Sequence, residues 1–176
     1  MLDNPQNIYL VGLMGAGKTT IGRVLARRLG WQFVDSDHEI VSRTGVSIPT
    51  IFEIEGESGF RRRECQVIED LTAARHLVMA TGGGVVLAAE NRLRLMENGF
   101  VVFLDVSPRQ LHERTRHDKN RPLLQVENPL QRLQMLHDER SSFYREAADL
   151  VIDANGCNAQ SVVQKILQEY QQRCSP

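Results

Sequence analysis

A glycine-rich segment that ends in a lysine and a threonine is the part of the sequence best suited to chemistry. Residues 12–19, Gly-Leu-Met-Gly-Ala-Gly-Lys-Thr, match the pattern GxxxxGK[ST] in full, between an apolar run and a segment of helical periodicity. Glycines let backbone N–H groups turn toward phosphate oxygens, and a helix start adds its positive dipole end. The lysine then reaches the β- and γ-phosphates, and the threonine hydroxyl ligates Mg²⁺. The segment predicts a nucleoside triphosphate site.

Two carboxylates, Asp35 and Asp37, follow the second apolar run with Ser36 between them. Residues two apart in a strand point to the same side, so both carboxylates are predicted to face the carboxyl end of that strand. Ligands bind there in open α/β sheets. One carboxylate can hold Mg²⁺ through a water, and the other can accept a hydrogen bond from a substrate hydroxyl. The alternative is that Ser36 or Asp37 caps the helical pattern that begins at His38.

Three successive glycines, Gly82 to Gly84, follow the third apolar run. Such a stretch is costly to order, and it suits a place where a ligand approaches the backbone closely. The alternative is a tight turn between a strand and a helix, which rarely needs three glycines. The segment therefore favours a ligand contact at the end of this strand.

Arginines lie in two further helical stretches. Arg61, Arg62 and Arg63 are consecutive, so at most two of them can point at one ligand, and Glu64 is a simple ion-pair partner. Arg140 can clamp a carboxylate with two parallel hydrogen bonds. Tyr144, four residues later on the same helical face, is expected to be a packing residue.

A polar and basic stretch covers residues 115–128. A long irregular segment in a compact domain is usually functional or disordered. One interpretation is a solvated, flexible loop. The other is a lid that closes over ATP, excludes water and brings an arginine to the transferred phosphoryl group. The positive charges in and beside this stretch are Arg114, Arg116, Lys119 and Arg121.

The elements that must position these residues follow from hydrophobic periodicity. Five continuous apolar runs lie at residues 8–11, 32–34, 77–80, 100–104 and 150–152, as expected for a parallel sheet covered on both faces. Helical patterns lie at residues 21–29 before Gly30, at 68–74, after the Asn128-Pro129 pair and at 159–170. The alternation predicts a doubly wound α/β domain. Residues 37–76 are too long for one helix, and we expect breaks at Gly45, Pro49, Gly56 and Gly59.

The composition restricts the class of protein. The chain has 176 residues, which suits one domain, with 21 Lys and Arg against 22 Asp and Glu residues. A net charge of −1 argues against a dedicated nucleic-acid binder. No apolar run approaches the roughly 18 residues of a membrane span, and the polar residues 1–7 do not resemble a signal peptide. We expect a cytosolic protein whose three scattered cysteines are reduced.

Taken together, the motifs resemble those of the shikimate kinase family. They occur in the family's order and at similar spacings from residue 8 to about residue 160. The glycine-rich loop is shared by many proteins, but its combination with the others is specific. The segments that carry the resemblance are residues 12–19, Asp35-Ser36-Asp37, Gly59-Phe60-Arg61, Gly82-Gly83-Gly84, Arg121-Pro122-Leu123-Leu124, and Arg140 with Tyr144.

The resemblance implies a P-loop kinase fold of the nucleoside-monophosphate-kinase type. This is an α/β fold with a five-stranded parallel sheet in the order 2-3-1-4-5 and helices on both faces. It implies transfer of the γ-phosphoryl group of ATP to the 3-hydroxyl of shikimate, in aromatic amino-acid biosynthesis, with Mg²⁺ as the cofactor. Residues 1–176 are then a single kinase domain, expected to be a cytoplasmic monomer, in which about 37–76 bind the substrate and about 115–128 form a mobile lid.

The family's functional residues carry over to the matching positions of this chain. The catalytic residues implied are Lys18, Asp37 and Arg121, and the metal is implied to bind Thr19 and, through water, Asp35. The residues implied to bind ATP are Gly15, Ala16, Gly17, Lys18, Thr19, Thr20, Arg114, Arg121 and Gln160. Those implied to bind shikimate are Asp37, Arg61, Gly82, Gly83, Gly84 and Arg140, the two arginines at its carboxylate. Arg62 and Arg63 inherit no role.

Three alternatives remain at the level of the sequence. A gluconate kinase shares the glycine-rich loop and the lid, but is not expected to carry both residues 59–61 and the three glycines. A nucleoside-monophosphate kinase needs a base pocket, whereas residues 37–76 offer an acid-binding arginine. A regulatory module that binds ATP without turnover has no need to keep the whole set of Lys18, Thr19, Asp35, Asp37 and Arg121.

Overall fold

The computed structural model of the chain describes residues 6–174. Most of the polar N-terminal stretch noted above, residues 1–5, lies outside the described residues, as do residues 175–176. Within the described range, no helix is both long and apolar enough to cross a membrane.

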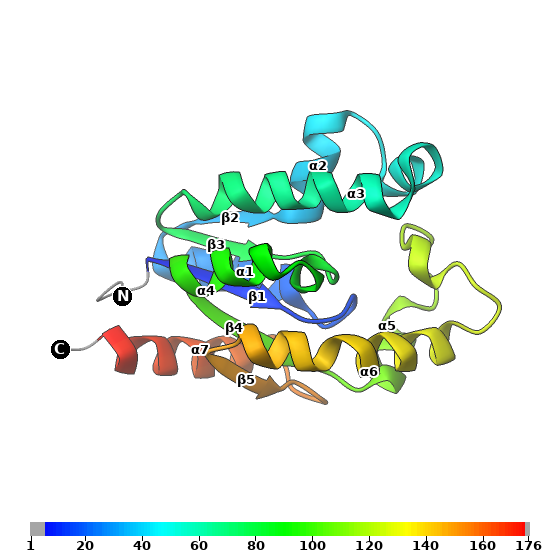
Figure 1. Cartoon of the computed structure of the whole chain (residues 1–176). Helices are drawn as coiled ribbons and strands as arrows, with labels where there is room; N and C mark the ends of the chain where they lie inside the picture. The colour runs from blue at the N-terminus through cyan, green and yellow to red at the C-terminus, as the bar shows by residue number, and fades with distance from the viewer. Residues whose placement is uncertain (1–5, 175–176) are drawn as a thin grey trace.

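A five-stranded parallel sheet forms the centre of the molecule (Figure 1). Its order is β2-β3-β1-β4-β5, so the order 2-3-1-4-5 implied by the resemblance is confirmed. All five apolar runs became strands. Their bounds are Asn7–Val11 for β1, Gln32–Asp35 for β2, Leu77–Ala80 for β3, Phe100–Asp105 for β4 and Leu150–Asp153 for β5.

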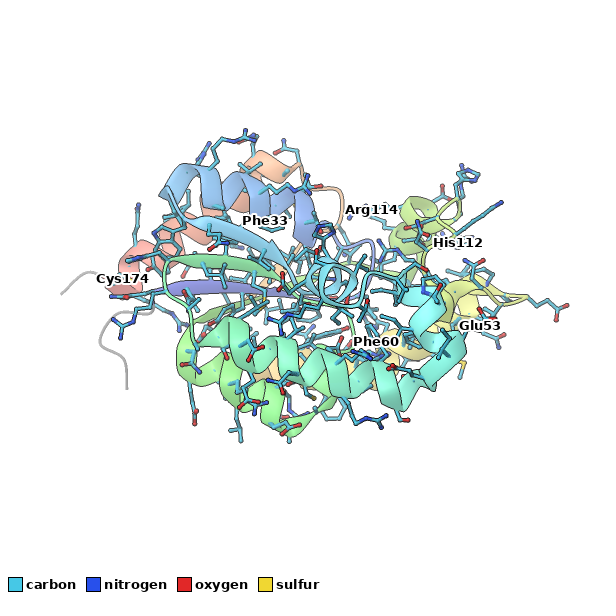
Figure 2. The ribbon with its side chains drawn as sticks, turned by 90° about the horizontal axis from the view of Figure 1, so that it is seen from above. Phe33, Glu53, Phe60, His112, Arg114 and Cys174 are labelled. Atoms are coloured by element: carbon cyan, nitrogen blue, oxygen red, sulfur yellow. The ribbon has the colours of Figure 1, made fainter. Side chains whose placement is uncertain are left out.

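Helices cover both faces of this sheet, as expected. Figure 2 shows α1 and α7 on one side of the strands and α3 and α4 on the other. The three central strands are buried along almost their whole length because they meet helices on both sides, which explains their continuous apolar sequences. The helices are α1 Lys18–Leu29, α2 Ser36–Thr44, α3 Ile48–Thr72, α4 Ala89–Asn98, α5 Pro108–Thr115, α6 Pro129–Ala147 and α7 Ala159–Cys174, with short 3₁₀ turns η1 Val85–Leu87 and η2 Pro122–Leu124.

The segment between β2 and β3 differs in detail from the sequence prediction. Helix α2 ends at Gly45, which is left-handed, and α3 is bent at Gly56, where φ is +71°, so these two breaks are confirmed. Pro49 does not break a helix, because it occupies the first turn of α3, where a missing N–H is harmless. The break predicted at Gly59 is wrong: this residue lies inside α3.

Of two further helix boundaries, one differs from the sequence prediction and the other agrees with it. Ala74 lies beyond the end of α3 at Thr72, so it does not extend the helical face of Ile68 and Leu71. Asn128 caps α6 as expected, because its side chain accepts a hydrogen bond from the Gln131 N–H at 3.1 Å. This cap ends the segment that links α5 to α6, which runs beyond the strands and faces the N-terminal part of α3 (Figure 1).

Candidate active site

One cavity of about 810 Å³ opens at the carboxyl ends of the strands. Figure 2 labels two of its lining side chains, Phe60 on α3 and Arg114 on α5, which approach from different sides. The glycine-rich loop forms part of its wall, and α2, α3, the loop after β3, the segment before α6 and α6 itself supply the rest. This is the edge of an open α/β sheet where ligands are expected.

The glycine-rich loop leaves backbone N–H groups free for an anion. Gly15 and Gly17 have φ of +84° and +95°, and a Cβ on Gly15 would lie 2.7 Å from the Thr115 methyl carbon. Gly17 precedes α1, and no side chain caps the first turn of this helix. The N–H groups of the first turn and the positive end of its dipole therefore face the cavity, where phosphate oxygens can bind.

Lys18 is buried beneath this loop, with 8% of its surface exposed. Its Nζ donates hydrogen bonds to the carbonyl oxygens of Gly12 at 2.6 Å and Leu13 at 2.8 Å. Burial, and after it the positive charge of Arg121, lower the pKa of this ammonium to about 8. An ammonium that is held in place at low hydration is ready to pair with phosphate oxygens.

Thr19 and Asp35 lie side by side at the start of α1 and the end of β2. The Thr19 hydroxyl donates to Asp35 Oδ2 at 2.8 Å. Asp35 Oδ1 accepts from the N–H groups of Asp37 and His38 at 3.0 and 3.2 Å, so Asp35 caps α2, and capping by Ser36 or Asp37 is wrong. A hydroxyl and a carboxylate are hard oxygen donors, which fit Mg²⁺. The described residues include no cluster of three or more acidic, His or Cys ligands.

Asp37 lies in the first turn of α2, not in the strand as the spacing predicted. Its side chain still reaches the cavity, where Oδ1 is buried without a hydrogen-bond partner. Burial, and after it the nearby charge of Asp35, raise the pKa of this carboxyl to about 6. The positive charges of Lys18, Arg121 and Arg61 act in the opposite direction. A buried acceptor without a partner suits a hydroxyl donor of a ligand.

Two arginines converge on the same part of the cavity. Arg61 donates to Glu64 at 2.9 Å and to Glu57 at 3.3 Å, and its Nε is buried without a partner. Arg140 is 2% exposed, and its Nε and Nη1 are buried without partners. Free buried guanidinium nitrogens are costly unless a ligand carboxylate pairs with them. By contrast, Arg63 pairs with Glu55 outside this region, and Arg62 is exposed.

Glu64 is a site residue that the sequence analysis treated only as an ion-pair partner. It is 1% exposed, and Oε2 has no partner. Burial raises its pKa to about 7, Arg61 lowers it, and the charge of Asp37 raises it. The available signal was its position three residues after Arg61, on the same helical face. Burial of that face depends on tertiary packing, which the local pattern does not show.

The three glycines after β3 make room for side chains of the site. A Cβ on Gly82 would lie 2.5 Å from Asp37 Oδ1 and 3.0 Å from Glu64 Oε2, and one on Gly84 would overlap the Arg61 guanidinium. A Cβ on Gly83 would be 3.6 Å from Arg140 Nη1, an ordinary contact. A side chain at Gly82 or Gly84 would therefore displace Asp37, Glu64 or Arg61 from the places they occupy in the site.

The remaining predicted residues fall into two groups. Arg114 lines the cavity and donates to the Gly15 carbonyl at 3.1 Å, and Arg121 lines it while pairing with Asp118 at 2.9 Å. Gln160 is exposed and accepts a hydrogen bond from Arg28 at 3.3 Å, outside the lining residues. An apolar wall that sequence reasoning did not identify completes the cavity, with Ile48, Pro49, Phe52, Phe60 and Leu123.

Comparison with known proteins agrees with this geometry. The model of the shikimate kinase family matches residues 14–171. The shikimate kinase of Dechloromonas aromatica (strain RCB) is 62% identical over 169 residues, which cover 96% of this chain and 92% of that protein. The solved structure of shikimate kinase from Acinetobacter baumannii in complex with shikimate is 52% identical, with a TM-score of 0.94, and covers 97% of this chain and 95% of that chain.

A gluconokinase structure from Sinorhizobium meliloti 1021 is much less similar. It is 19% identical, with a TM-score of 0.59, over 96% of this chain and 93% of that chain. That similarity shows a common fold alone. The family model, in contrast, covers most of the chain, and the Dechloromonas relative shares well over half of its residues. The chain belongs to the shikimate kinase family.

Proposed function

We propose that the chain transfers the γ-phosphoryl group of ATP to the 3-hydroxyl of shikimate, giving shikimate 3-phosphate and ADP. The observation that carries this proposal is a single cavity that joins the glycine-rich loop to two arginines with buried, unpartnered nitrogens, Arg61 and Arg140. The loop suits phosphates, and the arginines suit a carboxylate. The relative from A. baumannii, solved with shikimate, supports this acid as the acceptor.

The acceptor half of the cavity offers a partner for each part of a hydroxylated cyclic acid. We assign the carboxylate to Arg61 and Arg140, since each has at least one buried guanidinium nitrogen without a hydrogen-bond partner. The apolar wall, with Phe52 and Phe60, suits the carbon ring. We assign the hydroxyls of the acceptor to Asp37 and to the backbone around Gly83. The apolar wall beside these polar groups supports a cyclic hydroxylated acid over the open-chain acid gluconate.

Phosphoryl transfer needs charge stabilisation more than covalent chemistry. We assign this role to Lys18, Arg121 and the first turn of α1, which surround the expected phosphate position. Asp37 accepts the proton of the attacking hydroxyl, since a carboxyl with a pKa of about 6 is mostly ionised at neutral pH. Arg121 pairs with Asp118 through Nε, within residues 115–128, so the pair can move together when this segment closes as a mobile lid over the phosphates.

The metal-binding role of Thr19 and Asp35 is part of the proposal. Their oxygen atoms fit Mg²⁺, with Thr19 as the direct ligand and Asp35 acting through water. When bound, Mg²⁺ neutralises phosphate charge and lowers the cost of its redistribution during transfer. The nucleotide base is assigned to the part of the cavity near Arg114 and Ala159. Gln160 can join this contact only by giving up its bond to Arg28.

The functional unit proposed is one kinase domain formed by residues 1–176. A monomer is sufficient, because one chain supplies all the groups assigned to ATP and shikimate. The donor, ATP, is a cytoplasmic metabolite, which supports a cytoplasmic location. Residues 37–76 are assigned to acceptor binding because Asp37, Arg61 and Glu64 all line the cavity.

Release of ADP from Mg·ATP tests the proposal when shikimate, gluconate, a nucleoside monophosphate or no acceptor is added separately. Turnover with shikimate alone is expected, and Lys18→Ala is the inactive control. Turnover with another acceptor would reassign Arg61, Asp37 and Arg140 to that substrate. ATP binding without turnover on any acceptor would contradict the proposal in favour of a regulatory module.

A further inference from the structure

Two buried hydroxyl groups from other elements hold the glycine segment that follows β3. The Oγ atom of Ser36 accepts a hydrogen bond from the Gly82 N–H at 2.8 Å, and the Tyr144 hydroxyl donates to the Gly83 carbonyl oxygen. Ser36 is 0% exposed and Tyr144 is 1% exposed. Neither belongs to the described side chains that line the cavity. Both therefore act through the glycine segment and not by touching a ligand.

The glycine segment needs such external support. Glycine has more conformational freedom than any other residue, so three in succession are costly to order. Side chains of their own cannot fix them, because a Cβ on Gly82 would meet Asp37 and one on Gly84 would overlap Arg61. The local turn holds the carbonyl oxygens of Gly82 and Gly84, which accept from the Val85 and Leu87 N–H groups at 3.1 Å. Hydrogen bonds from neighbouring elements hold the Gly82 N–H and the Gly83 carbonyl.

Tyr144 is well placed to hold the Gly83 end of the glycine segment. Its ring stacks on Phe103, with 4.9 Å between ring centroids and 29° between the planes. Burial raises the pKa of its phenol, which therefore stays protonated and remains a donor. The positive charge of Arg140, four residues earlier on α6, lowers the pKa of the same phenol and so acts against burial. The Tyr144 hydroxyl thus holds Gly83 beside an arginine assigned to the acceptor carboxylate.

Ser36 links the other end of the segment to α2. It stands between Asp35, which caps α2, and Asp37, whose Oδ1 faces Gly82. Because the peptide group is planar, fixing the Gly82 N–H and the Gly83 carbonyl sets the two peptide planes that border the cavity. These planes, Asp37 and Arg140 then keep one arrangement relative to each other.

We propose that Tyr144 and Ser36 are positioning residues for the acceptor, holding the Gly82–Gly84 backbone, and with it Arg140, in the geometry that binds the hydroxylated acid. This inference rests on the proposed function, since it takes shikimate as the acceptor. It gives these two hydroxyls no role in nucleotide binding.

The test is Tyr144→Phe, which keeps the ring on Phe103 and removes only the hydroxyl. We expect the KM for shikimate to rise by about tenfold, the scale of one lost hydrogen bond to a binding group. The KM for ATP should stay within about twofold of wild type. Tyr9→Phe is the matched control, because Tyr9 is 0% exposed and its hydroxyl bonds to Asn98 and Asn7 at the other end of β1. Both KM values should be unchanged in this control.

Ser36→Ala tests the proposed positioning role at the hydrogen bond to Gly82. This variant decides the question if Tyr144→Phe does not fold. It should also raise the KM for shikimate selectively, by about three- to tenfold. A KM for shikimate within twofold of wild type in each folded variant would overturn the inference. Equal rises in the KM values for both substrates would overturn it as well, since they indicate general structural damage. A wild-type chain without shikimate turnover would instead refute the proposed function.

Discussion

Asp37 and Glu64 are two buried carboxyl groups that set the charge of the acceptor half of the cavity. Burial raises their pKa values to about 6 and about 7, and each has one oxygen without a partner. At neutral pH, Asp37 is mostly ionised and can accept a proton, whereas Glu64 is poised between its two forms. Bound hydroxyls and the arginines therefore meet a site whose charge changes close to neutral pH.

Asp37→Asn should fold normally and lose most of its kcat, by about 10²-fold or more, because an amide cannot take the hydroxyl proton. The kcat of the wild-type enzyme should itself fall as the pH drops through about 6, where Asp37 becomes protonated. Steady-state kinetics between pH 5 and pH 8 measure both effects. A near-normal kcat in the variant would contradict the placement of Asp37 beside the reacting hydroxyl.

The raised pKa of Asp37 also predicts how the stability of the folded chain depends on pH. Its folded pKa of about 6 exceeds the ordinary value of 3.8, so the folded chain binds more protons between these pH values. The stability that Asp37 contributes when protonated is therefore lost as the pH rises through about 6. The melting temperature of Asp37→Asn relative to that of wild type should therefore rise by a few degrees as the pH increases from 4 to 8. A difference that is independent of pH would contradict this raised pKa.

Arg61 and Arg62 are adjacent in sequence, but Arg61 lines the cavity and Arg62 is exposed outside it. Substitutions at the two positions are therefore a matched pair. Arg61→Ala should raise the KM for shikimate by about 10²-fold, because a charged hydrogen-bond pair to the carboxylate is lost, and should leave the KM for ATP nearly unchanged. Arg62→Ala should change neither, since this side chain is exposed and outside the cavity lining. An equal rise of both KM values in Arg61→Ala would refute its assignment.

At the scale of elements, the bend of α3 shapes the acceptor half of the cavity. Gly56 has φ +71° and ψ 179°, a conformation open essentially to glycine alone. The bend brings Phe52, before it, against Phe60, after it, with 4.8 Å between ring centroids. The ion pair of Glu55 with Arg63, with contacts of 2.6 and 2.9 Å, joins the same two parts of the helix.

Gly56→Ala tests the importance of this bend. The side chain would meet no atom within 4 Å, so its cost of about 1–3 kcal/mol comes from backbone strain alone. We expect a lower melting temperature and a KM for shikimate raised several-fold, because Phe52 and Phe60 no longer share one geometry. Gly30→Ala, also at positive φ in open space, should lose stability without changing KM. Similar KM values in both variants would show that the bend does not shape the site.

The sequence predicted the sheet well for a physical reason. Central strands that are buried on both faces must be continuously apolar, so β1, β3 and β4 could be recognised from the pattern alone. The interior of α3 was less predictable. Gly59 resembles a helix breaker, yet it lies inside the helix, and the reason for a glycine there is that a Cβ would lie 2.5 Å from the Glu55 Cβ. A local pattern does not reveal a close approach created by a bend three residues away.

The candidate site was predictable to a similar extent. The glycine-rich loop, Asp37, Arg61 and Arg140 carry recognisable residue types, and the structure brings all of them to one cavity. Glu64 and Tyr144 were assigned only ordinary roles, as an ion-pair partner and a packing residue. Their importance depends on burial and on contacts with the glycine segment, which arise only when α3, α6 and β3 pack together.

At the scale of the whole molecule, the parallel sheet directs every element of the site to one edge. The glycine-rich loop follows β1, the two aspartates lie at the end of β2 and the start of α2, and the three glycines follow β3. The acceptor side of the cavity and the phosphate side are therefore built on adjacent strands of one rigid sheet. We propose that this arrangement determines which hydroxyl of the acceptor lies next to the transferred phosphoryl group.

The most direct measurement is the position of phosphate on the product, determined by ³¹P–¹H correlation NMR after incubation with Mg·ATP and shikimate. The proposed transfer to the 3-hydroxyl predicts one product, in which phosphorus couples to the proton on the ring carbon that carries this hydroxyl. Phosphorus coupled to a proton at another ring position would contradict the orientation set by Arg61, Arg140 and Asp37. Signals of ADP and inorganic phosphate without that of a phosphate ester would contradict transfer to shikimate altogether.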